Sequence, residues 1–336
     1  MNELLKKLLI LRTPKIGPVK YRELLQQYGC DDAIIESLNL SDDFKDMVKR
    51  EIDKACEIGA QYIMDTDSQY PRSLLNVKNH PIVICARGNI ETLSKKSVSV
   101  VGTRHSTATG MNFVSELATA FVEHGFAVTS GMAMGTDTAA HIGALKPSGN
   151  TQTIAVLAGG VDNIWPLENE SLYYEILERG AVISEMPVGT NPVASNFIQR
   201  NHWVAAMSDW LIISEADMKS GSMTTARFAK EYGKQVFAVP GHPSDPRSVG
   251  PNYLIKNGDA TLCMSINDFF DDKNVKNNEK KYTYKNDILD KLGMIPVSES
   301  VLANLVKKTV SEIKADLVVL ELQGLVRKQD GGYVLN

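Results

Sequence analysis

Six short apolar runs between residues 97 and 241 constrain the fold of this chain more than any other feature of its sequence. They read SVSVVG, FAVTSG, TIAVLAGG, AVISEM, DWLIISEA and QVFAVPG, and segments with helical spacing separate them. Apolar runs without polar alternation are typical of strands buried on both faces, as in a parallel sheet with helices on each side. The sequence therefore predicts an α/β fold with a doubly wound, mainly parallel sheet.

The segments outside this region predict further domains. Residues 1–65 show helical spacing broken by TPKIGPVK, which resembles small helix-hairpin-helix modules whose glycine turn meets a DNA phosphate. A helix pair that simply packs explains the pattern equally well. We expect a sheet domain over 66–270, a polar linker over 271–285, and a winged helix over 286–336, formed by three helices and a hairpin that turns at Gly331-Gly332.

Composition limits the classes of protein to which the chain can belong. The net charge of -4 means that any nucleic-acid contact must rest on a local patch or groove. The four cysteines, Cys30, Cys56, Cys85 and Cys263, form no C-x-x-C pair, which favours reduced thiols in a cytoplasmic protein. No apolar run approaches the roughly 20 residues that cross a bilayer, and the N-terminal stretch reads as an amphipathic helix. We expect a cytoplasmic protein without membrane insertion.

The loops that follow the predicted strands are rich in glycine and hydroxyl side chains, and ligands bind at such loops in open α/β sheets. Gly102 is not part of a G-x-G-x-x-G motif, and there is no Walker-type loop, so we expect no dinucleotide or ATP cofactor. What remains is an anion site in which Arg104 binds phosphate beside Ser106 and Thr107 at a helix start. In the alternative, Arg104 pairs with a carboxylate and the hydroxyls cap the helix.

Catalytic patterns are sparse. Asp137 and His141 stand four residues apart, so they would share a helix face and could form an acid-base pair. A capping aspartate and a packed histidine are the commoner explanation of such a pair. No spacing of histidine, cysteine and carboxylate residues indicates a metal. We therefore expect a protein that is not an enzyme.

Aromatic residues lie in or beside the same loops. Trp165 and Phe197 accompany Arg200, whereas Trp203 lies in a helical segment and is expected in the core. Phosphate-binding loops interleaved with aromatic rings suit a single-stranded nucleic acid, because cations bind its backbone and rings stack on its bases. Core packing is the alternative for each ring, and Phe197 is the best stacking candidate.

Together these motifs resemble the DNA-processing protein A family, known as DprA or Smf. The matching strings are VGTRHST, SGMAMGTDTAAHIGAL, AVLAGGVDNIWPLEN, SEMPVGT, NFIQRN, KSGSMTTARFAKEYGKQVFAVPG and GPNYLIKNGDA. The resemblance implies an extended Rossmann-like sheet domain that forms homodimers, and an N-terminal domain resembling a sterile-alpha-motif fold. It also implies a protein that binds incoming single-stranded DNA in natural transformation, displaces single-strand-binding protein and loads RecA.

The resemblance and the anion site inferred above together give the expected DNA-binding residues. They are Gly102, Thr103, Arg104, Ser106, Thr107, Phe197, Arg200, Asn201, Lys219, Ser220, Gly221 and Ser222. Two positions depart from the family pattern, because Leu167 and His202 stand where basic residues are common. We expect these departures to weaken DNA affinity, since each lost phosphate contact lowers the salt dependence of binding.

Two alternatives come from other functional classes. Phosphoribohydrolases of the same fold superfamily carry a catalytic glutamate in P-G-G-x-G-T-x-x-E, but the equivalent helix start is SGSMTTAR, with Arg227 and no acid. In the second alternative the protein is chiefly an adaptor, and the winged helix is the domain through which it acts. The candidate recognition helix of that domain carries Glu312, Lys314 and Asp316, a charge pattern that favours a protein contact or plain packing over DNA.

Overall fold

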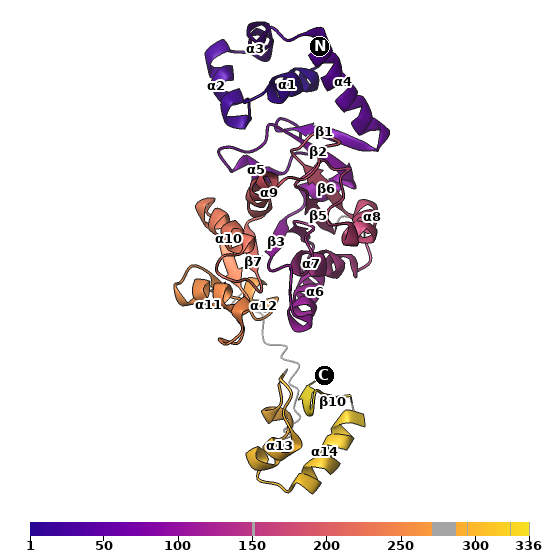
Figure 1. Cartoon of the computed structure of the whole chain (residues 1–336), viewed down its shortest axis with the longest axis vertical. Coiled ribbons are helices and arrows are strands. Elements are labelled where there is room, and N and C mark those ends of the chain that lie inside the picture. Colours follow the sequence, from indigo (N-terminus) through magenta and orange to yellow (C-terminus); the bar gives the residue numbers. More distant parts are fainter. Residues whose placement is uncertain (150–151, 271–286, 294, 323, 336) are drawn as a thin grey trace. The chain divides into compact units, whose positions relative to one another are not determined.

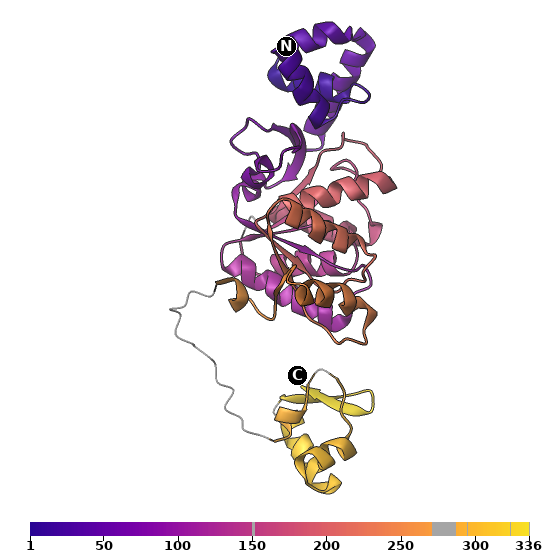
Figure 2. The same cartoon turned by 90° about the vertical axis from the view of Figure 1, so that its left-hand side faces the viewer.

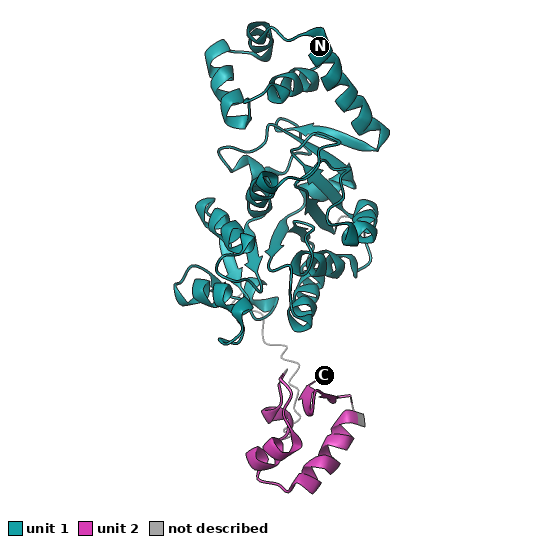
Figure 3. Ribbon diagram, viewed as in Figure 1, with its two compact units in different colours: residues 1–270 teal, residues 271–336 magenta. Residues whose placement is uncertain are grey.

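The computed structural model describes residues 1–149, 152–270, 287–293, 295–322 and 324–335. The chain forms two compact units, residues 1–270 and 271–336 (Figure 3). The predicted linker over 271–285 lies outside the described residues, and the boundary expected at residue 65 stays a prediction. Among the described helices, none has the length and apolarity needed to cross a membrane.

A nine-stranded sheet in the order β1-β2-β6-β5-β4-β3-β7-β8-β9 forms the centre of the first unit (Figure 1). Strands β3 to β9 pair in parallel, whereas β2 pairs antiparallel with both β1 and β6. The predicted doubly wound, mainly parallel sheet is confirmed, and β1, β2 and β9 add to the six predicted strands. The strand bounds are β1 Ala60–Met64, β2 Val83–Gly88, β3 Ser97–Val101, β4 Ala127–Ser130, β5 Thr153–Val156, β6 Ala181–Ser184, β7 Trp210–Ile213, β8 Gln235–Ala238 and β9 Thr261–Leu262.

Helices cover both faces of the sheet (Figures 1 and 2). One face packs against α6 (Ala108–Glu123), α7 (Thr136–Leu145), α8 (Glu170–Arg179) and α12 (Asn267–Phe270). The other packs against α5 (Arg72–Leu75), α9 (Ala194–Ala206), α10 (Gly221–Glu231) and α11 (Val249–Lys256). Short 3₁₀ turns η1 (Ile90–Ser94), η2 (Leu167–Asn169) and η3 (Pro246–Ser248) complete the connections. Successive strand residues face opposite sides, and the central strands β3 to β6 are buried on both sides.

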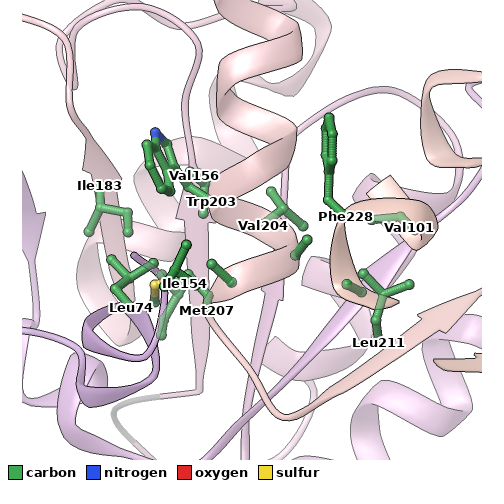
Figure 4. Packing of buried hydrophobic residues seen from close by; sticks show 14 of the residues in the cluster. Leu74, Val101, Ile154, Val156, Ile183, Trp203, Val204, Met207, Leu211 and Phe228 are labelled. Atoms are coloured by element: carbon green, nitrogen blue, oxygen red, sulfur yellow. The ribbon is translucent and has the colours of Figure 1, made fainter. Parts of the chain in front are cut away.

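Helix α9 is central to the packing of its face. Trp203 and Val204 lie in the same core cluster as Ile154 and Ile183 of the sheet (Figure 4). Trp203 is 5% exposed, so its predicted core position is confirmed. This burial fixes α9 across the strands and thereby sets the positions of the residues at its N-terminal half.

Four helices precede the sheet: α1 (Glu3–Arg12), α2 (Pro18–Tyr28), α3 (Asp31–Leu38) and α4 (Asp42–Glu57). Their apolar faces meet around Leu9 and Ile34 and include Ile82 and Val83 at the start of β2. The predicted helical segment is confirmed. Its last helix leads directly into β1, so the helices are joined to the edge of the sheet.

The second unit contains η4 (Leu289–Lys291), α13 (Glu299–Val306), α14 (Val310–Leu322), β10 (Val326–Gln329) and β11 (Gly332–Leu335). The hairpin turns at Gly331, where φ is 80°. The expectation of three helices is wrong for the first, which is a single 3₁₀ turn. That segment is short and Gly293 closes it, and helices of one or two turns are marginal on their own.

Candidate nucleic-acid interface

The loops after β3, β4 and β7 converge with α9 and α10 on a pocket of about 300 Å³. They meet because the carboxyl ends of parallel strands lie at one edge of the sheet. Eight of the predicted residues line this pocket: Gly102, Thr103, Arg104, Arg200, Asn201, Ser220, Gly221 and Ser222. Gly102 is required at this point, since a Cβ atom there would lie 2.3 Å from Oγ1 of Thr136.

Arg104 is exposed, and its guanidinium lies over two aromatic rings. The Cζ atom is 5.0 Å from the centre of the Trp165 ring and 5.7 Å from that of Phe197. The two rings meet edge to face with their centroids 4.7 Å apart. Within the described residues no carboxylate lies at ion-pair distance from Arg104. The carboxylate-paired alternative is therefore not observed, and the cation remains available to an external anion.

A second, larger pocket shares Arg104 and His105 with the first. Its volume is about 810 Å³, and Met134, Trp165 and Leu167 contribute apolar surface to it. Leu167 is 72% exposed, so the position where a basic residue was expected presents an apolar side chain to solvent. Arg104 thus lines both a polar pocket and a second pocket that combines apolar and aromatic surface with the carboxylate of Glu168.

The first turn of α10 supplies hydrogen-bond donors to the polar pocket. Ser220 is the N-cap residue, and its Oγ accepts from the backbone N–H of Met223. The N–H groups in the first turn of a helix have no intrahelical acceptor, and the helix dipole favours an anion there. Lys219 is exposed just ahead of this turn, although it is not among the residues that line the pocket. This part of the interface has the composition of a phosphate site.

The first turn of α6 has a different arrangement. Thr107 is its N-cap residue, but the carboxylate of Glu215 accepts from the backbone N–H and from Oγ1 of Thr107. Ser106 lies 2.7 Å from Oγ1 of Thr136, oxygen to oxygen. Both predicted residues are thus occupied by internal partners, and their contact with DNA stays a prediction. Sequence reasoning missed Glu215, whose only signal was an acidic residue just after an apolar run.

Arg200, which the resemblance assigns to DNA binding, is buried. It is 6% exposed, and Nη1 donates to the carbonyl oxygen of Gly131, with Oδ2 of Asp137 at 3.9 Å. Asp137 in turn accepts from the N–H groups of Gly131 and Ala133. Burial raises the pKa of Asp137, although Arg200 and these donors oppose the rise. Arg200 holds the loop after β4 in place as well as lining the pocket.

The two histidines that the sequence analysis discussed are both engaged inside the protein. Nδ1 of His141 lies 2.7 Å from Oγ1 of Thr153, and burial lowers the pKa of His141 to about 3. No hydrogen bond joins His141 to Asp137 in the described structure, so the packed-histidine interpretation holds. His202 stacks on Phe228 with its Nδ1 2.6 Å from the Tyr232 hydroxyl, and burial lowers its pKa.

A doubly wound sheet with a polar pocket at its carboxyl edge, followed by a separate unit of helices and a hairpin, defines a two-part α/β protein of the ligand-binding, Rossmann-like class. The chain belongs to the DNA recombination-mediator protein A family, whose model matches residues 61–274. The model of the DprA winged helix domain matches residues 284–332, which confirms the winged helix.

Similar proteins support this assignment over most of the chain. The DNA processing protein DprA of Bacillus subtilis is 34% identical over 276 residues, which cover 81% of this chain and 92% of that protein. Protein Smf of Synechocystis is 36% identical over 62% of this chain, but the match spans 52% of that protein. The crystal structure of DprA from Streptococcus pneumoniae matches with a TM-score of 0.66 at 30% identity, covering 79% of this chain and 94% of that chain.

A second solved structure is DNA processing protein A from Helicobacter pylori, described for its single-stranded DNA binding mode. It matches with a TM-score of 0.57 at 31% identity, covering 62% of this chain and 94% of that chain.

Proposed function

We propose that residues 1–270 bind single-stranded DNA along the carboxyl edge of the sheet. The observation that carries this proposal is the position of Arg104, whose exposed guanidinium lines a polar pocket, lies over two aromatic rings and forms no ion pair with any described residue. Guanidinium groups bind phosphate oxygens through two parallel hydrogen bonds. The relative from Helicobacter pylori, described for its single-stranded DNA binding mode, adds support from outside this chain.

The two pockets bind different parts of one nucleotide. A phosphate enters the polar pocket, where Arg104, Asn201 and the first turn of α10 provide donors. The base lies against Trp165 and Phe197, since every base has a face that stacks on an aromatic ring. Such contacts do not depend on base identity at this position. The remaining predicted contacts, including Thr103 and Lys219, flank the same path.

In the cell, this binding serves recombination. We infer that the protein protects incoming single strands during natural transformation and loads the RecA recombinase onto them, and that it displaces single-strand-binding protein in a separate step. The family description as a recombination mediator supports this role. We further propose a cytoplasmic homodimer formed through the sheet domain, acting without catalysis. The phosphoribohydrolases discussed above carry a catalytic glutamate in the first turns of the helix equivalent to α10. In this chain Arg227 is exposed in that helix, and its Nε lies 3.6 Å from Oε1 of Glu231.

Fluorescence anisotropy with labelled oligonucleotides tests the binding proposal. Single-stranded oligo-dT is expected to bind much more tightly than a duplex of the same length at moderate salt. Equal affinity for both forms would contradict it. RecA loading is tested by the rate at which RecA hydrolyses ATP on DNA coated with single-strand-binding protein. We expect the wild-type protein to shorten the lag, and no effect of the protein on the lag would refute the loading role.

A further inference from the structure

Three large apolar side chains are exposed around one concavity at the carboxyl edge of the sheet. Leu167, Met134 and Trp165 are 72%, 40% and 37% exposed, and all three line the pocket of about 810 Å³ that also contains Arg104. We call this concavity the apolar pocket. Exposed apolar residues that occur singly are common, but a group of them around one concavity is typical of a binding site. Because Leu167 is so exposed, it contributes little to the stability of the chain.

A buried asparagine joins two walls of the apolar pocket. Leu167 begins the turn η2, and Asn169 ends it. The side chain of Asn169 is buried, and its Nδ2 donates to the carbonyl oxygen of Met132 at 2.9 Å. Met132 belongs to the loop after β4, which also carries Met134. This hydrogen bond therefore fixes the turn that presents Leu167 against the loop that presents Met134.

The wall that carries Arg104 is fixed to the same loop. Gly135 has a φ of 76°, and a Cβ atom there would lie 2.5 Å from the carbonyl oxygen of Thr103. The backbone N–H of Thr136 donates to that oxygen at 3.1 Å. The loops after β3 and β4 are thus in direct contact through their backbones. Since the chain alone holds its walls together, the apolar pocket is preorganised, which lowers the entropic cost of binding.

The charges around the apolar pocket indicate which part of a nucleotide it accepts. Among the described residues that line it, Arg104 is the only arginine or lysine, and Glu168 adds a carboxylate. Glu168 is exposed and forms no ion pair within the described part of the chain. A phosphate placed beside Leu167 would lose water to an apolar surface and meet a carboxylate of the same charge. A base is uncharged and has two apolar faces, so the base suits this pocket better.

We propose that the apolar pocket holds a base of the bound strand and that Leu167, together with Met134, contacts this base directly. The inference rests on the proposed binding of single-stranded DNA, and it adds an aliphatic contact to the aromatic surface already assigned to the base. Salt weakens binding by opposing the release of counterions from phosphates, and an apolar contact releases none. The weaker affinity expected from the missing cation at position 167 is therefore restricted to low salt, and the leucine supports binding at high salt.

The experiment compares two labelled strands of equal length by fluorescence anisotropy: oligo-dT, and an abasic strand with the same sugar-phosphate backbone. Leu167→Ala is expected to bind oligo-dT roughly fivefold more weakly, the effect of leaving part of a leucine side chain in water, with an unchanged salt slope. Its affinity for the abasic strand should equal that of the wild type. Ile142→Ala is the matched control, because Ile142 is exposed on α7 and does not line the apolar pocket. This variant should bind both strands normally.

Leu167→Lys separates the apolar contact from the missing charge. The added cation is expected to make the slope of log K against log salt steeper by about one. The variant should therefore bind oligo-dT more tightly than the wild type at low salt and more weakly at high salt. Melting temperatures of both variants should match that of the wild type, since the side chain is exposed. If Leu167→Lys binds oligo-dT more tightly at every salt concentration, the leucine contributes nothing and the proposal is overturned.

The outcomes distinguish this inference from the proposed function. If the wild type binds oligo-dT but Leu167→Ala binds it equally well, the contact with Leu167 is refuted and single-strand binding stands. An equal loss of affinity for the abasic strand also refutes the contact, because that strand has no base to place in the pocket. If the wild type binds neither strand, the proposed function fails and the base contact fails with it.

Discussion

The carboxylate of Glu215 accepts two hydrogen bonds from Thr107, one from the backbone N–H at 2.7 Å and one from Oγ1 at 2.5 Å. The residues are 108 positions apart, and the contact joins the loop after β7 to the first turn of α6. Acidic groups stabilise a helix N-terminus because they interact with its dipole and its free N–H groups. The protein therefore neutralises this helix end internally and leaves the start of α10 free for an external anion.

Thr107→Ala is expected to lower the free energy of unfolding by about 1–2 kcal/mol, because the N-cap hydrogen bond and the bond to Glu215 are both lost. Single-strand affinity should change little. Chemical denaturation and anisotropy on the same preparation provide the two values. Ser220→Ala is the matched control, since it removes the cap of α10 and should weaken binding as well. A Thr107→Ala protein of normal stability that binds DNA poorly would restore Thr107 as a DNA contact.

Arg104→Ala is expected to weaken single-strand binding by roughly 1–3 kcal/mol, the value of a charge-assisted hydrogen bond to phosphate. The melting temperature should hardly move, because the exposed guanidinium forms no ion pair in the described structure. The slope of log K against log salt should fall by about one. An unchanged slope together with a large fall in melting temperature would show that Arg104 acts inside the protein.

Arg200→Ala should behave in the opposite way. Its removal leaves Asp137 buried without a nearby cation and Gly131 without a donor to its carbonyl, so we expect a loss of about 3–5 kcal/mol in folding stability. Arg227→Ala, on the exposed face of α10, is the control and should stay within about 0.5 kcal/mol of the wild type. Urea denaturation compares the variants. A fully stable Arg200→Ala protein with weak DNA binding would instead assign Arg200 to the DNA.

His141 is expected to make the protein sensitive to acid. Burial lowers its pKa from 6.5 to about 3, so below pH 6.5 the unfolded chain binds a proton that the folded protein does not. Stability from this residue is complete above pH 6.5 and falls between pH 6.5 and 3, by up to about 1.4 kcal/mol per pH unit. His141→Gln should flatten this part of the stability curve, whereas His242→Gln at an exposed position should not. Identical acid sensitivity in both variants would exclude His141 as the cause.

The central strands were predictable from sequence because burial on both faces leaves continuous apolar runs, as in AVIS and WLII. The strands β1 and β2 at one end of the sheet were not, because β1 mixes buried and exposed positions and both lie beside helical segments. Arg104 could be proposed as a phosphate ligand because a single loop carries it, and its contact with DNA stays a prediction. The burial of Arg200 was not predictable, since it depends on how α9 crosses the loop after β4.

Because Arg200 packs against the loop after β4, positions 131 and 200 constrain each other in evolution. A Cβ atom on Gly131 would lie 1.5 Å from Nη1 of Arg200, so the guanidinium fills the space that any side chain at position 131 would need. A relative can therefore acquire a larger residue at 131 only if the arginine is shortened or displaced first. We expect the two positions to covary across homologous sequences, with a side chain at 131 appearing only in lineages that have lost the arginine at 200.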